Sequence, residues 1–351
     1  MKIIIVTGPT GGHFFPGLAI GEMFGNEEVK FYIPEREFII KWLNKKKFTY
    51  RIIPTIRLTK KNFLFFIFKF FYILILSILL YKKENPKIVI GTGSYVSVPF
   101  IIGAKILKKK TFIHEQNYVP GKATRLLSFF VDYIFLTFPS FDKLPKRKCK
   151  ITGFPLISDL KKEYERKEVL KELGLKDKKN LLVFGGSQGS KFLNSLICEN
   201  IEYFKQKNFQ IIHIAGKEKE FVEKFYKEKN FNGIVFDFFY DMTKIYSVCD
   251  FIICRSGAGT IVEIVEKKIP AFLIPYPYAG GHQIENAKYL ENKGCCFVME
   301  EKEENRKKFT SLFEEFIVKC ENIKENLKKI TLTDEGKIKE IILKFLRNEK
   351  D

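Results

Sequence analysis

Short apolar runs alternate with helical stretches along almost the whole chain, and this alternation limits the possible folds more than any other feature. Each run has the length of a buried strand, and a longer helical stretch separates it from the next run. The pattern predicts parallel sheets that helices cover on both faces. The expected strands are residues 3–6, 30–33, 50–53, 88–90, 111–113 and 133–136 in a first series, and residues 181–184, 211–214, 234–236, 251–253 and 271–274 in a second.

The two series indicate two domains, because each opens with a strand that runs into a glycine-rich loop. A length of 351 residues suits about two domains. We expect an α/β fold with two Rossmann-like, doubly wound domains facing a central cleft. The charged segment 161–171 follows the first series and places the domains at 1–157 and 158–332. Residues 333–351 contain a helical pattern, which predicts a helix that packs back on the first domain or is a plain capping helix.

Charge and cysteine usage narrow the possible partners. The chain has 61 Lys and Arg against 41 Asp and Glu, a formal net charge of +20. This suits a membrane surface, a nucleic acid or a nucleotide diphosphate, although a lysine-rich genome would give the same excess. No arginine-glycine tract, zinc spacing or RNA-binding motif occurs, so we expect no nucleic acid. The seven cysteines lack C-x-x-C spacing and the first apolar run is too short for a secretory signal, which predicts reduced thiols in the cytoplasm.

Residues 62–80 differ from the rest, because they are nearly all Phe, Leu and Ile, with Lys69 as their only charge. Lysine pairs bracket the segment at 60–61 and 82–83, and its length approaches the roughly 20 residues that span a bilayer. A helix lying on an anionic membrane surface is the favoured interpretation. A buried helix and a true span are the alternatives. A span is disfavoured because the flanking strands look like neighbours in one sheet.

Residues 254–263 place a glycine turn and a carboxylate at the start of an expected helix. The turn at Gly257 and Gly259 follows a buried strand, so backbone N–H groups and the helix dipole would face an anion such as a diphosphate. Glu263 would lie about one turn into the helix, where a carboxylate can accept hydrogen bonds from both hydroxyls of a ribose. The stretch therefore predicts a nucleotide site.

Other glycine-rich and polar segments predict a ligand-binding edge on both sheets. His13 follows a glycine pair and is a candidate general base, because its unperturbed pKa lies near neutrality; a satisfied loop histidine is the alternative. Residues 114–117, which follow an expected strand, would form a polar ligand floor. Ordinary turns or helix caps would explain the remaining segments equally well. They are Gly91-Thr92-Gly93-Ser94-Tyr95, Gly185-Gly186-Ser187-Gln188-Gly189 and Gly280-Gly281-His282-Gln283-Ile284-Glu285-Asn286.

Five blocks, in this order and spacing, resemble the MurG family, the N-acetylglucosaminyltransferases of peptidoglycan synthesis. The resemblance covers nearly the whole chain, and the ordered set is far more specific than any single loop. The blocks are Thr10-Gly11-Gly12-His13, Gly93-Ser94-Tyr95-Val96-Ser97, His114-Glu115-Gln116-Asn117, Gly185-Gly186-Ser187-Gln188-Gly189 and Cys254-Arg255-Ser256-Gly257-Ala258.

The resemblance implies a GT-B fold and an inverting glycosyltransferase. The enzyme would move N-acetylglucosamine from UDP-N-acetylglucosamine to lipid I, undecaprenyl-pyrophosphoryl-N-acetylmuramyl pentapeptide, and form the β-1,4 link of lipid II. It would bind peripherally at the cytoplasmic face of the bacterial plasma membrane, with other cell-wall synthesis proteins as further partners. We expect no metal or other cofactor, because no Asp-x-Asp motif occurs and a helix N-terminus can support the departing diphosphate.

The resemblance also implies roles for individual residues. His13 would be the base or would position the acceptor, and Glu115 is the other catalytic candidate. Glu263 would bind the ribose, the backbone of Phe239 the uracil, and Gln283 the donor sugar. The implied donor-site residues are Thr10, Gly11, Gly12, Asn117, Ser187, Phe239, Arg255, Ser256, Gly257, Ala258, Gly259, Thr260, Glu263 and Gln283. The implied acceptor-side residues are Gly93, Tyr95, His114 and Gln116.

Two departures from the family pattern bear on these roles. Where the family has Gly-Asn-Pro followed shortly by an arginine, this chain has Gly153-Phe154-Pro155 followed by Leu156 and Ile157, so an arginine expected on the donor diphosphate is missing. His282 stands where the family often has Gln. Two rival functions stay open: a glycolipid-forming transferase that uses UDP-glucose or UDP-galactose on diacylglycerol, and a non-catalytic membrane partner that recruits a second subunit.

Overall fold

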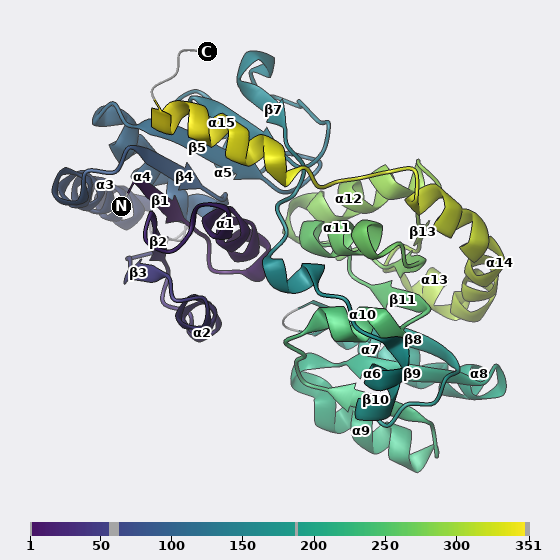
Figure 1. Cartoon of the computed structure of the whole chain (residues 1–351). Coiled ribbons are helices and arrows are strands. Elements are labelled where there is room, and N and C mark those ends of the chain that lie inside the picture. The colour runs from purple at the N-terminus through teal and green to yellow at the C-terminus, as the bar shows by residue number, and fades with distance from the viewer. Residues whose placement is uncertain (1, 56–62, 187–188, 348–351) are drawn as a thin grey trace. The chain divides into compact units, whose positions relative to one another are not determined.

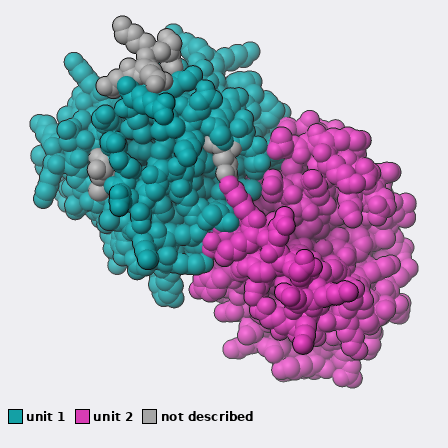
Figure 2. All heavy atoms as spheres, in the orientation of Figure 1, with its two compact units in different colours: residues 1–158, 332–351 teal, residues 159–331 magenta. Residues whose placement is uncertain are grey.

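The structure is a computed structural model that describes residues 2–55, 63–186 and 189–347. The chain divides into two compact units, which Figure 2 colours separately. Unit 1 comprises residues 1–158 and 332–351, and unit 2 comprises residues 159–331. The boundary expected after residue 157 lies beside the boundary found, and the last segment of the chain belongs to unit 1.

Within the described residues, unit 1 holds a seven-stranded parallel sheet in the order β3-β2-β1-β4-β5-β6-β7 (Figure 1). This order is that of a doubly wound fold, in which strands are added first on one side of β1 and then on the other. The strands are β1 (Ile3–Val6), β2 (Val29–Ile33), β3 (Thr49–Ile52), β4 (Ile88–Gly91), β5 (Lys110–Glu115), β6 (Tyr133–Leu136) and β7 (Cys149–Ile151). The helices are α1 (Gly11–Phe24), α2 (Glu37–Lys45), α3 (Phe63–Glu84), α4 (Ser94–Ile106), α5 (Lys122–Leu127) and α15 (Glu335–Arg347), with short 3-10 helices η2 (Lys146–Lys148) and, at the unit boundary, η3 (Ser158–Lys161).

Unit 2 repeats this plan with a six-stranded parallel sheet, again among its described residues, in the order β10-β9-β8-β11-β12-β13. The strands are β8 (Lys179–Phe184), β9 (Phe209–Ile214), β10 (Gly233–Phe236), β11 (Phe251–Cys254), β12 (Ala271–Leu273) and β13 (Phe297–Val298). The helices are α6 (Arg166–Glu172), α7 (Lys191–Glu199), α8 (Ile201–Gln206), α9 (Lys219–Glu228), α10 (Met242–Val248), α11 (Ala258–Lys267), α12 (His282–Glu291), α13 (Glu303–Lys307) and α14 (Phe309–Leu327), with 3-10 helices η4 (Gly216–Glu218) and η5 (Ala279–Gly281).

The predicted fold class is confirmed, whereas two edge strands were missed. The residues of β1 are all fully buried, as expected for a central strand with helices on both faces. β7 carries Lys150 at its centre and β13 has only two residues, so neither forms an apolar run. β5 is longer than predicted and continues through Glu115.

Helix α3 packs one face on α4 and exposes the other. Ile73 and Ser77 are buried, and the Ser77 hydroxyl donates a hydrogen bond to the carbonyl of Pro99 at 3.3 Å. A side chain at Gly103 would collide with Ser77, so this glycine allows the two helices to approach closely. The opposite face is apolar and exposed, and it consists of Phe65, Phe68, Phe71, Tyr72, Ile75 and Leu79.

The segment Phe65–Glu84 of α3 is long and apolar enough to cross a bilayer, but its connections oppose a crossing. It joins β3 to β4, and both strands belong to one parallel sheet. The alternative of a core helix is wrong, because only 17% of the most apolar part of this segment is buried. Lys82 and Lys83 lie exposed at its end, whereas residues 60–61 lie outside the described residues.

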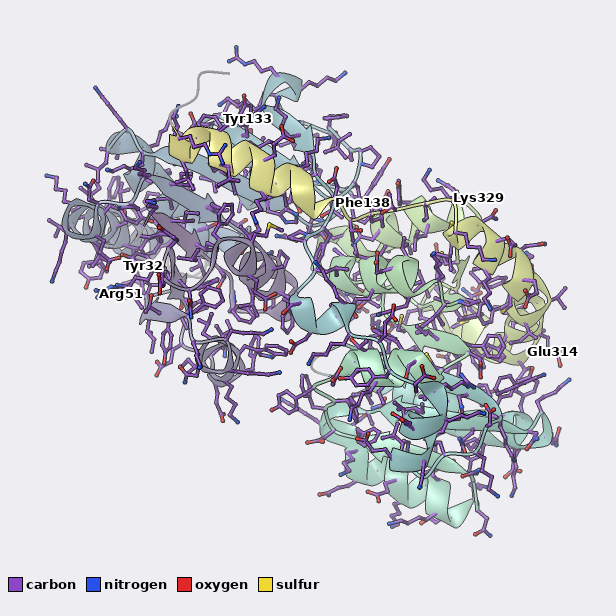
Figure 3. All side chains as sticks on the ribbon, viewed as in Figure 1. Tyr32, Arg51, Tyr133, Phe138, Glu314 and Lys329 are labelled. Carbon is purple, nitrogen blue, oxygen red and sulfur yellow. The ribbon has the colours of Figure 1, made fainter. Side chains whose placement is uncertain are left out.

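The end of α3 is fixed to the sheet by a half-buried ionic cluster. Glu84 accepts hydrogen bonds from Lys30 at 2.8 Å and from Arg51 at 3.3 Å. The rings of Tyr32 and Tyr81 stack beside this cluster with centroids 5.9 Å apart, and Figure 3 labels Tyr32 and Arg51 on their neighbouring strands. The exposed face of α3 is therefore held in a defined orientation on unit 1.

Helix α15 packs on the sheet of unit 1, although it follows unit 2 in the sequence. The ring of Phe345 lies 5.2 Å from that of Phe112 and 5.8 Å from that of Tyr133, which Figure 3 labels beside the helix. An antiparallel bridge between Gly153 and Thr333 brings the chain back to this unit. Of the two alternatives for the last helix, the structure has the one that packs on the first domain.

Candidate active site

His13 lies in the first turn of α1, which begins at Gly11 and has Thr10 as its N-cap. The segment expected to be a loop is therefore helical, with Thr10 and Gly12 exposed at its start. Nδ1 of His13 lies 2.9 Å from the carbonyl oxygen of Thr92. A carbonyl can only accept, so in the neutral ring Nδ1 carries the proton and Nε2 carries the lone pair. Nε2 is thus the atom that can take a proton from a substrate hydroxyl.

Two glycines leave room for this imidazole. Gly93 has a φ of +82°, and a Cβ there would lie 3.0 Å from Nδ1 of His13. A Cβ at Gly8 would lie 2.9 Å from the His13 Cβ. The Thr92 hydroxyl also donates to the His13 carbonyl at 2.6 Å, so His13 is held from both its backbone and its ring. Tyr95, in the first turn of α4, is 38% exposed on the same edge of the sheet.

Glu115 is the centre of a closed hydrogen-bond network. Its two oxygens accept from the backbone N–H groups of Asn117 and Gly121, each at 3.0 Å, from the Asn117 side chain at 3.2 Å, and from the Thr124 hydroxyl. The carboxylate is buried, and it accepts the hydrogen bonds of the donors in the loop that leads into α5. Asn117 is half-buried. These contacts make Glu115 a structural acceptor and favour His13 as the proton acceptor.

His114 and Gln116 are also buried, so they lie beneath the surface of the expected ligand floor, and their acceptor-side role stays a prediction. Nε2 of His114 lies 3.2 Å from the Gly153 carbonyl, and burial lowers the pKa of His114 to about 4, so the ring is neutral. The Gln116 amide donates to the Thr92 carbonyl at 2.9 Å and lies 3.2 Å from Nδ1 of His114. The two residues therefore act on the site through Thr92, the carbonyl that also binds His13.

In unit 2, α11 begins directly after the loop that follows β11, with Gly257 as its N-cap. The first backbone bond of the helix runs from Ile261 to the Gly257 carbonyl. The N–H groups of Ala258, Gly259 and Thr260 consequently have no partner within the helix. Such a helix start binds phosphate through these N–H groups and the helix dipole, which matches the predicted position of the diphosphate.

Hydrogen bonds tie this helix start to the beginning of α12. The Ser256 hydroxyl donates to the Gln283 carbonyl at 2.7 Å, and the Asn286 amide donates to the Ser256 carbonyl at 3.3 Å. Oε1 of Gln283 accepts from the backbone N–H of Tyr276 at 3.0 Å. With that oxygen engaged, the side-chain NH₂ of Gln283 is the group that can donate to a ligand.

Glu263 is half-buried on α11, and one hydroxyl holds it. The Tyr246 hydroxyl donates to its Oε2 at 2.5 Å. Burial raises the pKa of Glu263 from its ordinary value of 4.5 to about 7, against the opposing effects of the Tyr246 hydrogen bond and the charge of Lys267. The carboxyl group therefore changes its protonation state near neutral pH.

Arg255 is buried and fully engaged within unit 2 rather than open to a ligand. Its guanidinium donates to the Ile274 carbonyl at 3.0 Å and to the Ser190 hydroxyl at 2.8 Å, and it forms an ion pair with Glu301. Ser190 is also the N-cap of α7, where its hydroxyl accepts from the Leu193 N–H. Arg255 therefore connects the end of β11 to the glycine-rich segment before α7, and its predicted place on the donor stays a prediction.

The glycine-rich segment of unit 2 is described only in part, because Ser187 and Gln188 lie outside the described residues. Gly186 and Gly189 have φ values of +86° and +74°. A Cβ at Gly189 would lie 2.5 Å from the Ala215 carbonyl oxygen, so the turn requires glycine there. The predicted role of Ser187 stays a prediction.

Phe239 lies in the loop after β10, with its half-buried ring 4.9 Å from that of Phe236. The ring is thus anchored on the protein, which leaves the backbone of this loop as the part that could contact a nucleobase.

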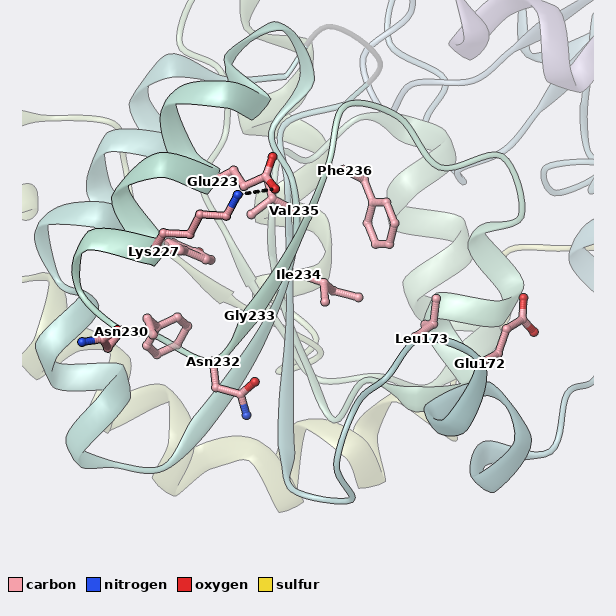
Figure 4. Close-up of a pocket in the computed structure, with 12 residues that line it drawn as sticks. Glu172, Leu173, Glu223, Lys227, Asn230, Asn232, Gly233, Ile234, Val235 and Phe236 are labelled. Atoms are coloured by element: carbon pink, nitrogen blue, oxygen red, sulfur yellow. Dashed lines mark ion pairs between the residues drawn. The ribbon is translucent and has the colours of Figure 1, made fainter.

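A cavity of about 890 Å³ lies nearby along β10, between residues of α6 and α9, and Figure 4 shows it with the ion pair of Glu223 and Lys227. None of the predicted site residues lines this cavity.

The two departures from the family pattern have different surroundings. Ile157 is buried, so the position of the missing arginine is part of the core of unit 1. His282 is half-buried as the first residue of α12. Within residues 2–55, 63–186 and 189–347, no group of three or more His, Cys, Asp or Glu side chains could hold a metal ion.

Sequence reasoning missed Thr92, Thr124, Tyr246 and Asn286, which hold the residues above in place. Thr92 and Asn286 stood inside segments that were singled out, but their partners lie far away in sequence. Tyr246 and Thr124 belong to helices without a motif. A buried tyrosine usually finds a partner for its hydroxyl, and that rule was the one available signal for Tyr246.

Comparisons with known proteins agree with this geometry. The glycosyltransferase family 28 N-terminal domain matches residues 3–136, and the C-terminal domain of the same family matches residues 180–341. The chain is 37% identical to the UDP-N-acetylglucosamine--N-acetylmuramyl-(pentapeptide) pyrophosphoryl-undecaprenol N-acetylglucosamine transferase of Aquifex aeolicus, over 93% of this chain and 95% of that one. It is 36% identical to the transferase of the same name from Halothermothrix orenii, with 90% of each chain covered.

Among solved structures, the fold is similar to that of the crystal structure of Acinetobacter baumannii MurG. The TM-score is 0.76 at 24% identity, and the match covers 98% of this chain and 99% of that chain. Both halves of the chain therefore have their counterpart in one enzyme family, with the strand order described above. The chain belongs to the MurG family of glycosyltransferases.

Proposed function

We propose that this protein transfers N-acetylglucosamine from UDP-N-acetylglucosamine to lipid I, with inversion at the anomeric carbon, and so forms lipid II. The observation that carries the proposal is the match of at least nine tenths of the chain to transferases named for this donor and acceptor. Two features support the chemistry: an imidazole on unit 1 that would accept the proton, and a helix start on unit 2 that would bind the anion.

Unit 1 would supply the base. As the acceptor hydroxyl attacks the anomeric carbon, its proton passes to Nε2 of His13 and the bond from the sugar to UDP breaks. The Thr92 carbonyl accepts from Nδ1–H and so stabilises the imidazolium that forms. This arrangement fixes the ring orientation before substrate arrives, which lowers the entropy cost of the step.

Unit 2 would bind the nucleotide. Glu263 accepts from the ribose hydroxyls, the backbone near Phe239 recognises the uracil, and Gln283 donates to the sugar. The first turn of α11 supports the negative charge that develops on the departing diphosphate, so the transfer would need no metal or other cofactor.

We propose a peripheral membrane contact through the exposed face of α3, at the cytoplasmic side of the plasma membrane where lipid I and other cell-wall enzymes would be met. The apolar side chains of this face and the exposed Lys82 and Lys83 suit the headgroup region of an anionic bilayer. Replacing Phe68, Phe71 and Ile75 together by Ser should release the protein from anionic vesicles in a flotation assay. Unchanged vesicle binding would contradict the membrane contact. The three replacements do not alter the buried residues Ile73 and Ser77, so the packing of α3 on α4 should be kept.

The transfer reaction is tested with the purified chain, radiolabelled UDP-N-acetylglucosamine and a short-chain lipid I analogue, with and without EDTA. Label is expected in the lipid fraction under both conditions. A preference for UDP-glucose or UDP-galactose with diacylglycerol would instead support the glycolipid-forming rival. Absence of any transfer by the single chain, with UDP still bound, would favour the non-catalytic rival.

A further inference from the structure

Tyr246 meets the candidate ribose ligand from a neighbouring helix. It lies on α10, is 4% exposed, and donates from its hydroxyl to Oε2 of Glu263 at 2.5 Å. Within the described part of the chain, no second group forms a hydrogen bond with this carboxyl group. Its Oε1 is not one of the unpaired oxygens that are fully buried. Tyr246 thus occupies one oxygen and leaves the other accessible at the surface.

The surroundings of Glu263 otherwise oppose its ionised form. Burial has the largest effect on the pKa of Glu263 and raises it. Two smaller effects lower this pKa: the Tyr246 hydrogen bond, and then the charge of Lys267 on α11. The thiol of Cys254 on β11 is the other ionisable neighbour, and burial raises its pKa well above the ordinary range, so it is neutral. Burial also raises the pKa of Tyr246 well above 10, so its hydroxyl remains a donor at any physiological pH.

We propose that Tyr246 is a positioning residue of the nucleotide site, whose hydroxyl fixes the Glu263 carboxylate so that Oε1 faces the ribose hydroxyls. This inference rests on the proposed function, because it takes Glu263 as the ribose ligand. A glutamate side chain without such a bond loses several rotamers when it binds a ligand, and this loss weakens binding. A protonated carboxyl group would also present an O–H where the ribose requires an acceptor.

The test uses the full chain and measures affinity for UDP and for 2′,3′-dideoxy-UDP by calorimetry between pH 6 and pH 9. The variants are Tyr246→Phe, Glu263→Gln and their double mutant. Tyr226→Phe is the matched control, because it removes a buried hydroxyl of the same unit that lies 2.9 Å from Nδ1 of His213 instead. Thermal unfolding of each variant checks that the fold is kept.

Tyr246→Phe is expected to weaken UDP binding about 3- to 10-fold near pH 7, the net effect of one typical hydrogen bond. The loss should shrink at pH 9, where the carboxylate ionises without help, and it should nearly disappear for the dideoxy analogue. The double mutant should bind UDP like Glu263→Gln alone, because Tyr246 acts through that carboxylate. Tyr226→Phe should bind UDP like the wild type.

Three outcomes would overturn the inference. If Glu263→Gln weakens UDP binding while Tyr246→Phe does not, only the positioning role is wrong. If Tyr246→Phe weakens UDP and dideoxy-UDP equally at every pH, the residue has a merely structural role. If Glu263→Gln binds UDP like the wild type, the ribose assignment fails and the inference fails with it. Should Tyr246→Phe not fold, Tyr246→Met gives the same test, because its flexible apolar side chain fills the buried space without a hydroxyl and leaves Glu263 unchanged.

Discussion

Each unit holds a glutamate close to the carboxyl end of a strand, and the two carboxylates are built in opposite ways. Glu115 ends β5 and receives hydrogen bonds from two backbone N–H groups, an amide and a hydroxyl. Glu263 receives one hydrogen bond, from Tyr246, and has a pKa raised to about 7. Leaving a half-buried carboxylate so poorly satisfied costs stability, which a purely structural residue has no reason to retain. Hydrogen-bond saturation therefore separates a structural carboxylate from one that is open to a ligand.

The largest expected effect tests whether proton transfer belongs to His13 rather than to Glu115. His13→Ala should lower turnover about 10²- to 10⁴-fold, because it removes the proton acceptor. UDP affinity should stay near that of the wild type, because Glu263 and the first turn of α11, which would bind the ribose and the diphosphate, lie in unit 2. Steady-state transfer kinetics and calorimetry of the same preparation check both parts. Equal loss of UDP affinity in His13→Ala and Glu263→Ala would contradict the division of roles.

The second prediction concerns the open carboxylate. Glu263→Gln should weaken UDP binding about 10- to 100-fold, as expected for the loss of charge-assisted hydrogen bonds to the ribose. Turnover at saturating donor should change little, because the ribose does not react. Donor titrations of transfer activity separate the two quantities. A variant with unchanged donor affinity but low turnover would refute the ribose role.

The third prediction concerns the saturated carboxylate. Glu115→Gln should destabilise unit 1 by about 1.5–3 kcal/mol, because an NH₂ group replaces one of two oxygens that each face two donors. The midpoint of thermal unfolding should fall while UDP affinity stays unchanged. If this variant instead folds normally and loses as much turnover as His13→Ala, Glu115 is the proton acceptor after all.

The smallest effect is a difference in pH dependence between wild type and Glu263→Gln. The folded protein keeps the Glu263 proton up to about pH 7, whereas the unfolded chain releases it near pH 4.5. This group therefore stabilises the fold below pH 4.5, and its contribution is lost as the pH rises through 7. Unfolding midpoints of the wild type should fall relative to those of the variant between pH 5 and pH 8. UDP affinity should change in the opposite direction, because the wild type should bind UDP more tightly as the pH rises. UDP itself also titrates, so the pH dependence measured for Glu263→Gln is subtracted from that of the wild type.

The sheets and the helix starts could be predicted from the sequence, whereas the burial and the partners of the polar residues depend on contacts between distant parts of the chain. The apolar runs predicted both sheets, and the Gly257 turn predicted the start of α11 within a residue, because both signals are local. The polar residues 114–117 were expected to form an open ligand floor after the strand, because the polar end of a buried strand and an exposed polar segment look alike in sequence. Their burial depends on the carbonyls of Thr92 and Gly153, which are distant in sequence. The contacts of Arg255 with Ser190 and Glu301 were not predicted for the same reason, since both partners lie far from it along the chain.

The return of the chain to unit 1 has a consequence for biogenesis. Gly153 meets the backbone of residues 332–334, with no space for a side chain, and Phe345 covers Phe112. The ribosome makes these covering residues after unit 2, so all of unit 2 has been synthesised before unit 1 can be completed. A premature stop codon just before α15 would thus damage the domain that was translated first, and would leave the rings of Phe112 and Tyr133 uncovered for chaperones and proteases to recognise.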